Sequence, residues 1–253
     1  MAVPCWSLLR TITIEIHDIR HYKDVVVKEV SIMKRSSWSV LLIVVAFVVS
    51  GCATTRGVLE VAEEESVNPD SGQAVKIVQV VDTREFQIDP PQPDIPSLKN
   101  NEVNDPAITS RAIARKRNSF GAAMGDILLP EGQTVMGLVS SSLAKGLREN
   151  GFRVVSESDP DFASAAPLEV EIAKFWGWFQ PGFWQLKLHY VTAITVTGPV
   201  AIFTDSEAFS SDVELGFQVA SSSNWTETID ASLAALNQEI SARLAEYRRT
   251  NPN

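Results

Sequence analysis

The stretch LEVEIAKFWGWFQPGFWQLKLHYVTAITVTG, residues 168–198, contains two runs in which apolar and polar residues alternate. The alternation covers residues 168–172 in the first run and 184–190 in the second. A period of two residues is typical of a strand with one buried face. The residues between the runs, QPG at 180–182, favour a turn. The stretch therefore predicts an antiparallel hairpin with one face in contact with solvent.

Two amphipathic segments predict helices. In residues 223–249 apolar side chains recur every three or four positions, at Ile229, Leu233, Leu236, Ile240, Leu244 and Tyr247. The basic residues near its end suit the negative end of the helix dipole and are Arg243, Arg248 and Arg249. Residues 131–151 show the same spacing at Val135, Leu138, Val139, Leu143 and Leu147. Gly151 stands where a left-handed helix cap is expected.

Further strands are predicted at 74–85, read as a central strand, at 152–157 and at 200–217, with a second hairpin at 111–129. The proline-rich stretch 89–96 predicts an extended loop. Helices combined with hairpins in this order indicate the α+β class. We expect a mostly antiparallel sheet with two helices packed on one face, in a single domain of residues 74–250.

Composition restricts the function classes. The chain has 253 residues, 45 % of them hydrophobic and 21 % charged, which is enough for one sizeable core. Residues 1–51 hold six Lys or Arg and four Asp or Glu, which leaves 16 basic and 27 acidic residues, a formal charge of −11, for the rest. An acidic domain of this kind is not typical of nucleic-acid binding. The two cysteines, Cys5 and Cys52, are too few for a disulfide framework or a Cys-x-x-Cys metal site.

An apolar run without charges covers residues 40–49. It is too short for a membrane-spanning helix, which needs about 20 residues. Lys34 and Arg35 precede it, so the segment has the positive region and the apolar region of a secretory leader. Residues 33–51 are therefore predicted to be a signal peptide.

The sequence VVSGC, residues 48–52, resembles the lipobox of bacterial lipoproteins. The resemblance implies transfer of diacylglyceryl to the thiol of Cys52, cleavage before it and acylation of the new amine. Acyl chains contribute about 0.8 kcal/mol per buried CH₂, so several chains together hold a protein stably on a membrane. The alternative is a buried cysteine in an uncleaved signal anchor. Ala53 stands where an aspartate retains enterobacterial lipoproteins in the inner membrane, which implies the periplasmic face of the outer membrane.

The segments on either side of the leader are interpreted from this resemblance. Met33 begins a leader of ordinary length, so residues 1–32 are predicted to be a non-native upstream extension from a misplaced start codon. The alternative is a genuine cytosolic extension with its own function. Residues 52–73 are rich in acidic and loop-forming residues and predict a flexible acidic tether.

Four short motifs carry a second resemblance. VVDTRE (80–85), ARKRNSFGAAMGDI (114–127), GQTV (132–135) and GLRENGFRVV (146–155) are together similar to the YajG-type family of bacterial lipoproteins. The resemblance covers the layout of residues 75–250 and includes no catalytic signature. It implies a location and a fold more than a mechanism.

Catalytic motifs are missing from the sequence. It contains no HExxH, no GxSxG, no glycine-rich phosphate loop and no cluster of metal-ligand residues. His189 alternates with apolar residues and is expected to be a solvated strand residue. The serines at 140–142 have no base beside them, and Glu169 and Glu171 fit a charged sheet surface. We therefore expect a protein that is not an enzyme and uses no cofactor or metal.

Two clusters are candidate binding surfaces. In FWGWFQPGFW, residues 175–184, alternation directs Phe175 and Phe179 to one side of the strand and two tryptophans to the other. Core packing accounts for part of these rings, and the remainder would form an exposed apolar patch for a partner or membrane. The residues predicted for that patch are Trp176, Trp178, Phe179, Phe183 and Trp184.

The second cluster is basic and consists of Arg111, Arg115, Lys116 and Arg117. Such a run is commonly a solvated strand edge that discourages strand pairing. The alternative is a docking site for an anionic partner, a lipid phosphate or a glycan.

These observations lead to two functional hypotheses. The first is a lipid-anchored, non-catalytic interaction module that serves an envelope protein complex. The second is a periplasmic carrier of an apolar ligand, a lipid or acyl chain, that uses the aromatic hairpin. A carrier needs an apolar cavity, whereas a docking module needs a filled core and an exposed patch.

Overall fold

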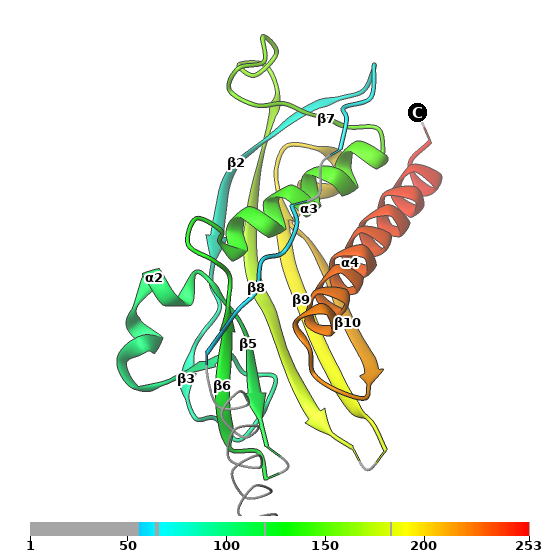
Figure 1. Ribbon diagram of the computed structural model, residues 1–253. Helices are drawn as coiled ribbons and strands as arrows, with labels where there is room; N and C mark the ends of the chain where they lie inside the picture. The colour runs from blue at the N-terminus through cyan, green and yellow to red at the C-terminus, as the bar shows by residue number, and fades with distance from the viewer. Residues whose placement is uncertain (1–55, 64–65, 119, 183, 253) are drawn as a thin grey trace, which may run out of the picture. The chain divides into compact units, whose positions relative to one another are not determined.

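The computed structural model describes residues 56–63, 66–118, 120–182 and 184–252. Their main sheet consists of β1 (Gly57–Val58), β2 (Ala74–Asp82), β5 (Ala112–Arg117), β6 (Ala123–Leu128), β7 (Arg153–Val154), β8 (Ala166–Pro181), β9 (Leu186–Thr197) and β10 (Glu207–Phe217). A separate pair is formed by β3 (Gln87–Ile88) and β4 (Ser97–Leu98). The helices are η2 (Asn100–Asn104), α2 (Pro106–Thr109), α3 (Val135–Glu149), η3 (Ala201–Phe203) and α4 (Ser222–Thr250) (Figure 1).

The longest strand, β8, organises the sheet. One edge of β8 pairs with β9 in antiparallel register, as the alternation in 168–198 predicts, and β10 pairs antiparallel with β9. The other edge of β8 pairs with two strands in succession, β2 as far as Ile172 and β5 at Gly177 and Trp178, both parallel to it. The chain thus leaves the edge of β8 after β2 and returns to the same edge as β5.

The sheet is mixed, so the prediction of a mostly antiparallel sheet is wrong, while the α+β class is confirmed. The parallel pairings are β1 with β6, β2 with β7, β2 with β8 and β5 with β8. The sequence revealed the hairpins, because their turns are local, but parallel partners lie far apart in the chain. The strand β2, predicted to be central, pairs with β7 through only Ala74 and Val75 and is otherwise close to an edge.

The helices α3 and α4 cover one face of the sheet with the apolar stripes that the sequence predicts (Figure 1). Gly151 has φ +85° and follows α3, where Phe152 N donates to Leu147 O at 3.0 Å and Gly151 N to Arg148 O at 3.0 Å. This is a Schellman cap. The largest buried side chains of this core are Phe175, Tyr190, Phe203, Phe209 and Trp225.

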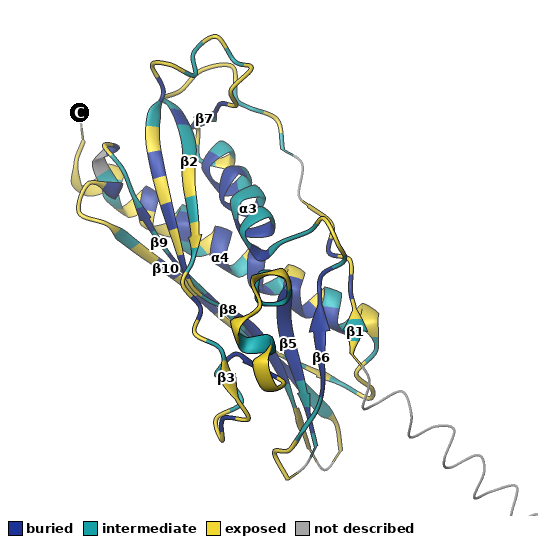
Figure 2. Cartoon of the chain, turned by 90° about the vertical axis from the view of Figure 1, so that its left-hand side faces the viewer, coloured by how far each residue is buried: buried dark blue, intermediate teal, exposed yellow. Residues whose placement is uncertain are grey.

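The opposite face carries a second, smaller core beneath the segment 83–111, which includes β3, β4, η2 and α2. The buried members of this core are Leu98, Ala112, Leu128, Trp176 and Trp178. Figure 2 shows that β5 and β6 are buried where this segment lies close to them. The four-residue helix α2 was not predicted. The proline-rich stretch 89–96 is the loop between β3 and β4, as predicted.

The prediction of a flexible tether over 52–73 does not fit its described residues. Val61 is fully buried and Leu59 is 7 % exposed, and Gly57 and Val58 form β1 against β6. Asn68 Nδ2 donates to Val154 O at 3.0 Å. Apolar residues spaced among the glutamates allow the segment to pack on the domain despite its acidic composition.

Candidate functional site

The two predicted clusters lie side by side because β5 and β8 are neighbours. The strand registers place Asp126, Arg115, Trp178, His189 and Glu214 opposite one another on β6, β5, β8, β9 and β10 in turn. Directly opposed residues of neighbouring strands point to the same face. We call these five residues the cross-strand row. Its inner members lie beneath the segment 83–111, and its outer end at Glu214 is exposed.

The acidic end of the row is an ion cluster around the buried carboxylate of Asp126. Asp126 accepts from Arg56 Nε at 3.0 Å and from Arg56 Nη2 at 2.6 Å, and the same Nη2 lies 2.6 Å from Glu102. Burial acts to raise the pKa of Asp126, but the hydrogen bonds and charge of Arg56, together with the charge of Arg115, lower it overall. Hydrogen bonding to Asp126 is the main cause that raises the pKa of Arg56. Because Arg56 precedes β1 and Asp126 lies on β6, these hydrogen bonds hold the start of β1 against β6.

Arg115 is 3 % exposed, and its Nη1 lies 3.9 Å from Asp126 Oδ2. Among the described residues, neither Nε nor Nη1 of Arg115 has a hydrogen-bond partner. Burial lowers the pKa of Arg115, and the negative charge of Asp126 opposes that effect. The guanidinium is a buried cation, paired with Asp126 by charge.

The remaining basic residues do not form an exposed cationic patch, so the prediction of a solvated basic edge is wrong. Arg117 is 4 % exposed and donates to Gly121 O at 2.9 Å, and burial lowers its pKa. Arg111 donates to Ala107 O at 2.9 Å and to Leu129 O at 3.1 Å. Lys116 is half-buried. The sequence could not show this, because the groups that cover these cations come from distant segments.

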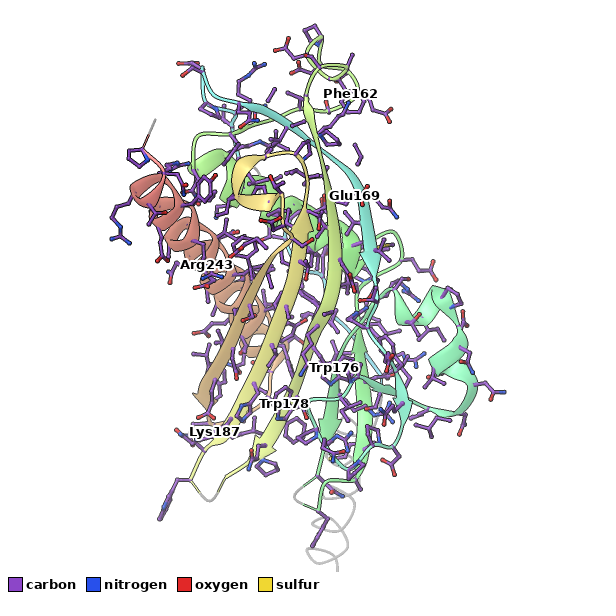
Figure 3. All side chains as sticks on the ribbon, turned by 180° about the vertical axis from the view of Figure 1, so that it is seen from behind. Phe162, Glu169, Trp176, Trp178, Lys187 and Arg243 are labelled. Atoms are coloured by element: carbon purple, nitrogen blue, oxygen red, sulfur yellow. The ribbon has the colours of Figure 1, made fainter. Side chains whose placement is uncertain are left out.

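The aromatic side chains of β8 mostly belong to the two cores, so the predicted exposed patch is wrong for Trp176 and Trp178 (Figure 3). Trp176 is 1 % exposed and donates from Nε1 to Pro93 O at 3.2 Å. The ring of Trp178 stacks on His189 with centroids 5.0 Å apart and an interplanar angle of 1°. His189 is therefore half-buried rather than fully solvated, although it lies on the predicted polar face.

The other members of the predicted patch differ from one another in burial. Phe179 is half-buried against the first core, on the side shared with Phe175, as alternation predicts. Trp184 is 83 % exposed in the turn between β8 and β9. Phe183 and Cys52 lie outside the described residues.

Exposed apolar residues gather at one end of the sheet, of which the sequence predicted only Trp184 to be exposed. The turns after β5, β8 and β10 contain Phe120, Trp184 and Val219, which are 93 %, 83 % and 62 % exposed. We call the described residues of 118–122, 182–185 and 218–221 the turn end. In the sequence, each of these polar turns contains an apolar residue. A single apolar residue in one turn does not indicate a patch, and the sequence does not show that the three turns lie together.

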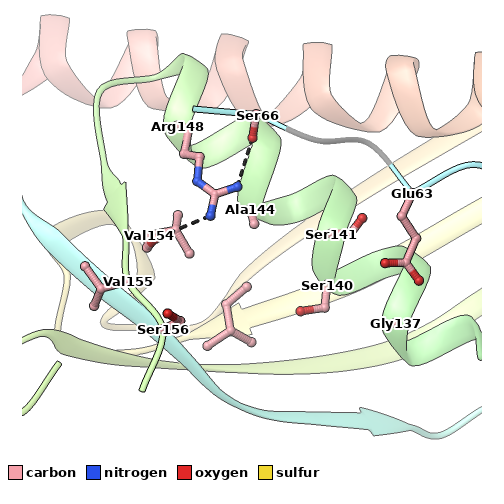
Figure 4. A pocket seen from close by; sticks show the side chains of 11 residues that line it. Glu63, Ser66, Gly137, Ser140, Ser141, Ala144, Arg148, Val154, Val155 and Ser156 are labelled. Carbon is pink, nitrogen blue, oxygen red and sulfur yellow. Dashed lines mark hydrogen bonds between the residues drawn. The ribbon is translucent and has the colours of Figure 1, made fainter. Parts of the chain in front are cut away.

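An open hollow of about 690 Å³ lies beside α3 (Figure 4). Its polar lining includes Glu63, Ser66, Ser140, Ser141 and Arg148. Arg148 donates to Ser66 Oγ at 2.9 Å and to Asn68 Oδ1 at 2.9 Å. The described residues contain one histidine, His189, which lies on the opposite face of the sheet, so no serine of the hollow is paired with an imidazole base.

The described ranges contain no group of three or more His, Cys, Asp or Glu that could hold a metal ion. None of the helices described is long and apolar enough to cross a membrane.

No family model and no curated protein matches the chain. A solved structure described as an uncharacterized protein is similar to 77 % of this chain and 99 % of its own, with 12 % identity and a TM-score of 0.36.

Proposed function

We propose that the protein is a lipid-anchored, periplasm-facing and non-catalytic interaction module of the bacterial cell envelope. Cys52 carries the lipid, and Ala53 directs the protein to the outer membrane. The lipobox-like sequence at 48–52 and the leader-like segment before it support the anchor. Membership of the YajG-type family is part of the same proposal.

The observation that carries the choice of an interaction module is the filled core. Large rings occupy the space between the sheet and the two helices, with Tyr190 fully buried and Trp225 2 % exposed. A carrier of an acyl chain would need an apolar cavity. The hollow beside α3 is open and has serine, glutamate and arginine in its lining. The aromatic side chains that a carrier would use for ligand capture, Trp176 and Trp178, are packed in the second core.

The hollow beside α3 is the surface that we assign to a protein partner. It presents both a carboxylate, Glu63, and a guanidinium, Arg148, together with several hydroxyl groups. Concave polar surfaces of this kind fit the side chains and main chain of a partner segment.

The anchor can be tested by replacing Cys52 with serine. The wild type should enter the membrane fraction, incorporate labelled palmitate and have an N-terminal mass that begins at an acylated Cys52. The Cys52→Ser variant should lose all three properties, whereas the matched Cys5→Ser variant should keep them. A Cys52→Ser protein that remained in the membrane fraction would refute the anchor.

The docking surface can be tested by crosslinking in intact membranes. A photoreactive residue in place of Ser140 should capture one protein partner, whereas the same residue in place of the exposed Gln238 on α4 should not. Equal capture from both positions, or none from Ser140, would refute the assignment of the hollow.

A further inference from the structure

Three turns meet at the turn end because of the strand directions. β5 runs parallel to β8, so the turns that follow these strands lie at the same end of the sheet. β10 runs antiparallel to β9, and its last residue Phe217 is opposite Leu186, the first residue of β9. The loop after β10 therefore lies at this end too, as Figure 1 shows at the bottom of the view. Each turn contributes one exposed apolar side chain, Phe120, Trp184 or Val219.

The charge of these turns differs from that of the rest of the domain. Residues 116–122, 180–187 and 215–221 contain no aspartate or glutamate, in a chain with 27 acidic residues beyond position 51. The cations of the same stretches are already engaged, since Arg117 is buried and Lys187 pairs with Glu214 at 2.5 Å, so the apolar side chains are the main feature of this end. An end that is apolar and without acidic residues is compatible with the anionic surface of a phospholipid bilayer.

The direction of β1 relates the turn end to Cys52. β6 begins next to the turn 118–122 and runs away from it, and β1 is parallel to β6 with Gly57 opposite Ile127. Gly57, the first residue of β1, therefore lies at the end of β1 that faces the turn end. Cys52 precedes Gly57 by five residues, and Ala122 precedes Ile127 by five residues, so the chain is long enough to reach the level of the turn. The reach from Cys52 to Arg56 is at most about 14 Å.

We propose that the turn end contacts the bilayer that holds the lipid of Cys52, with Phe120 and Trp184 in the interfacial region. This inference rests on the proposed lipid anchor. Tryptophan favours the membrane–water interface, where its ring contacts acyl chains and its N–H contacts polar groups. The short connection to the anchor raises the effective concentration of the turn end at the membrane, so weak contacts are sufficient.

Tryptophan fluorescence provides the test. Of the tryptophans beyond residue 51, Trp176, Trp178 and Trp225 are at most 9 % exposed, whereas Trp184 is exposed. The acylated full-length product would be reconstituted in vesicles of phosphatidylethanolamine and phosphatidylglycerol with acyl chains brominated close to the glycerol. The emission of Trp184, taken as the difference between wild type and Trp184→Phe, should be mostly quenched.

A matched control moves the tryptophan to the other end of the domain. Val67 is 92 % exposed, and its neighbour Asn68 donates a hydrogen bond to Val154 O on β7. Because β7 pairs with the start of β2, Val67 lies far from the turn end. The double variant Trp184→Phe/Val67→Trp should have an exposed tryptophan that brominated lipid does not quench. Equal quenching of both tryptophans would overturn the proposed orientation.

The outcomes separate this inference from the anchor. An acylated, vesicle-bound protein whose Trp184 is not quenched would overturn the contact and leave the anchor intact. A protein without lipid on Cys52 would overturn both. If a photoreactive residue at position 184 captured a protein instead of phospholipid in native membranes, the turn end would be a protein-binding surface and the membrane contact would be refuted.

Discussion

Arg84 donates a hydrogen bond from Nη1 to the main-chain oxygen of Phe175 at 3.0 Å, between the part of β8 that pairs with β2 and the part that pairs with β5. The same guanidinium donates to Ala112 O at 2.6 Å and to Thr109 O at 2.9 Å. Asp82 accepts from it twice, at 2.8 Å and 2.7 Å. At this point β8 changes its partner from β2 to β5, so some carbonyl groups have no N–H donor from a neighbouring strand. The Arg84 side chain supplies donors to these carbonyl groups.

Replacement of Arg84 by lysine should therefore be strongly destabilising. An ammonium group lacks the planar fork that serves two carboxylate oxygens and three carbonyls together. The Arg84 side chain is fully buried, and incomplete pairing of such a group costs about 3 kcal/mol. Urea unfolding would measure the loss, with Arg249→Lys on the exposed end of α4 as the control. A loss equal to that of the control would contradict this role.

Gly177 explains the interruption in FWGWF and gives a second prediction. A Cβ at this position would lie 2.6 Å from Tyr190 Cδ2 and 3.0 Å from a ring carbon of Trp225. Both rings are buried and cannot move aside easily. Gly177→Ala should cost about 2 kcal/mol of unfolding free energy through overpacking. Gly137→Ala on α3, where the nearest atom is 3.5 Å away, should stabilise by about 1 kcal/mol. Thermal and urea unfolding of both variants would measure these changes in unfolding free energy. A Gly177→Ala variant as stable as the wild type would disprove the close packing.

The ion cluster at Asp126 predicts a pH dependence. The pKa of this carboxyl group is below its usual 3.8, so its contribution to stability is complete above that value and is lost as the pH falls through the lowered pKa. Asp126→Asn should cost about 3 kcal/mol at neutral pH, because Arg115 would remain buried without its counter-charge. The difference between variant and wild type should become smaller at a pH below 3.8. Denaturant titrations at several pH values measure it, and a difference that did not change with pH would exclude this mechanism.

A buried hydroxyl cluster predicts coupling between α4 and the sheet. Ser232 Oγ lies 2.9 Å from Thr192 Oγ1 and 2.9 Å from Ser211 Oγ, and all three residues are buried. Ser232→Ala should cost about 1 to 2 kcal/mol, because two hydroxyl groups lose a partner. Ser232→Ala combined with Ser211→Ala should cost less than the sum of the single changes. Ser222→Ala at the exposed start of α4 is the control, and strict additivity would show that the cluster is not a unit.

The sequence was sufficient for elements whose evidence is local. The stripe that includes Leu233 and Ile240 identified α4, and the alternation around Leu188 identified β9, because each pattern repeats within a few residues. It was insufficient for the pairing of β2 and β5 with one edge of β8, because that pairing joins segments about ninety and sixty residues apart, and no local signal specifies it.

The candidate site was harder to predict than the fold. Arg115 and Arg117 were expected to be solvated, since charged residues are rarely buried without partners. Their burial depends on the segment 83–111 and on Asp126, which the chain brings together only after folding. The alternation of Phe175 and Trp176 was predicted correctly, but not the second core that buries the tryptophans, because a strand pattern does not show which faces are covered.

The sixteen residues of β8 extend the sheet over about 50 Å from one end to the other. The loop before β8 contains Ser156, Asp159 and Asp161, at the end opposite to Trp184. A domain that rests on the bilayer by its turns would hold this acidic loop at a nearly fixed height in the periplasm. The length of β8 would then determine how far from the membrane the loop lies. A shorter β8 would hold the loop closer to the membrane, where it could not contact the same layer of the envelope.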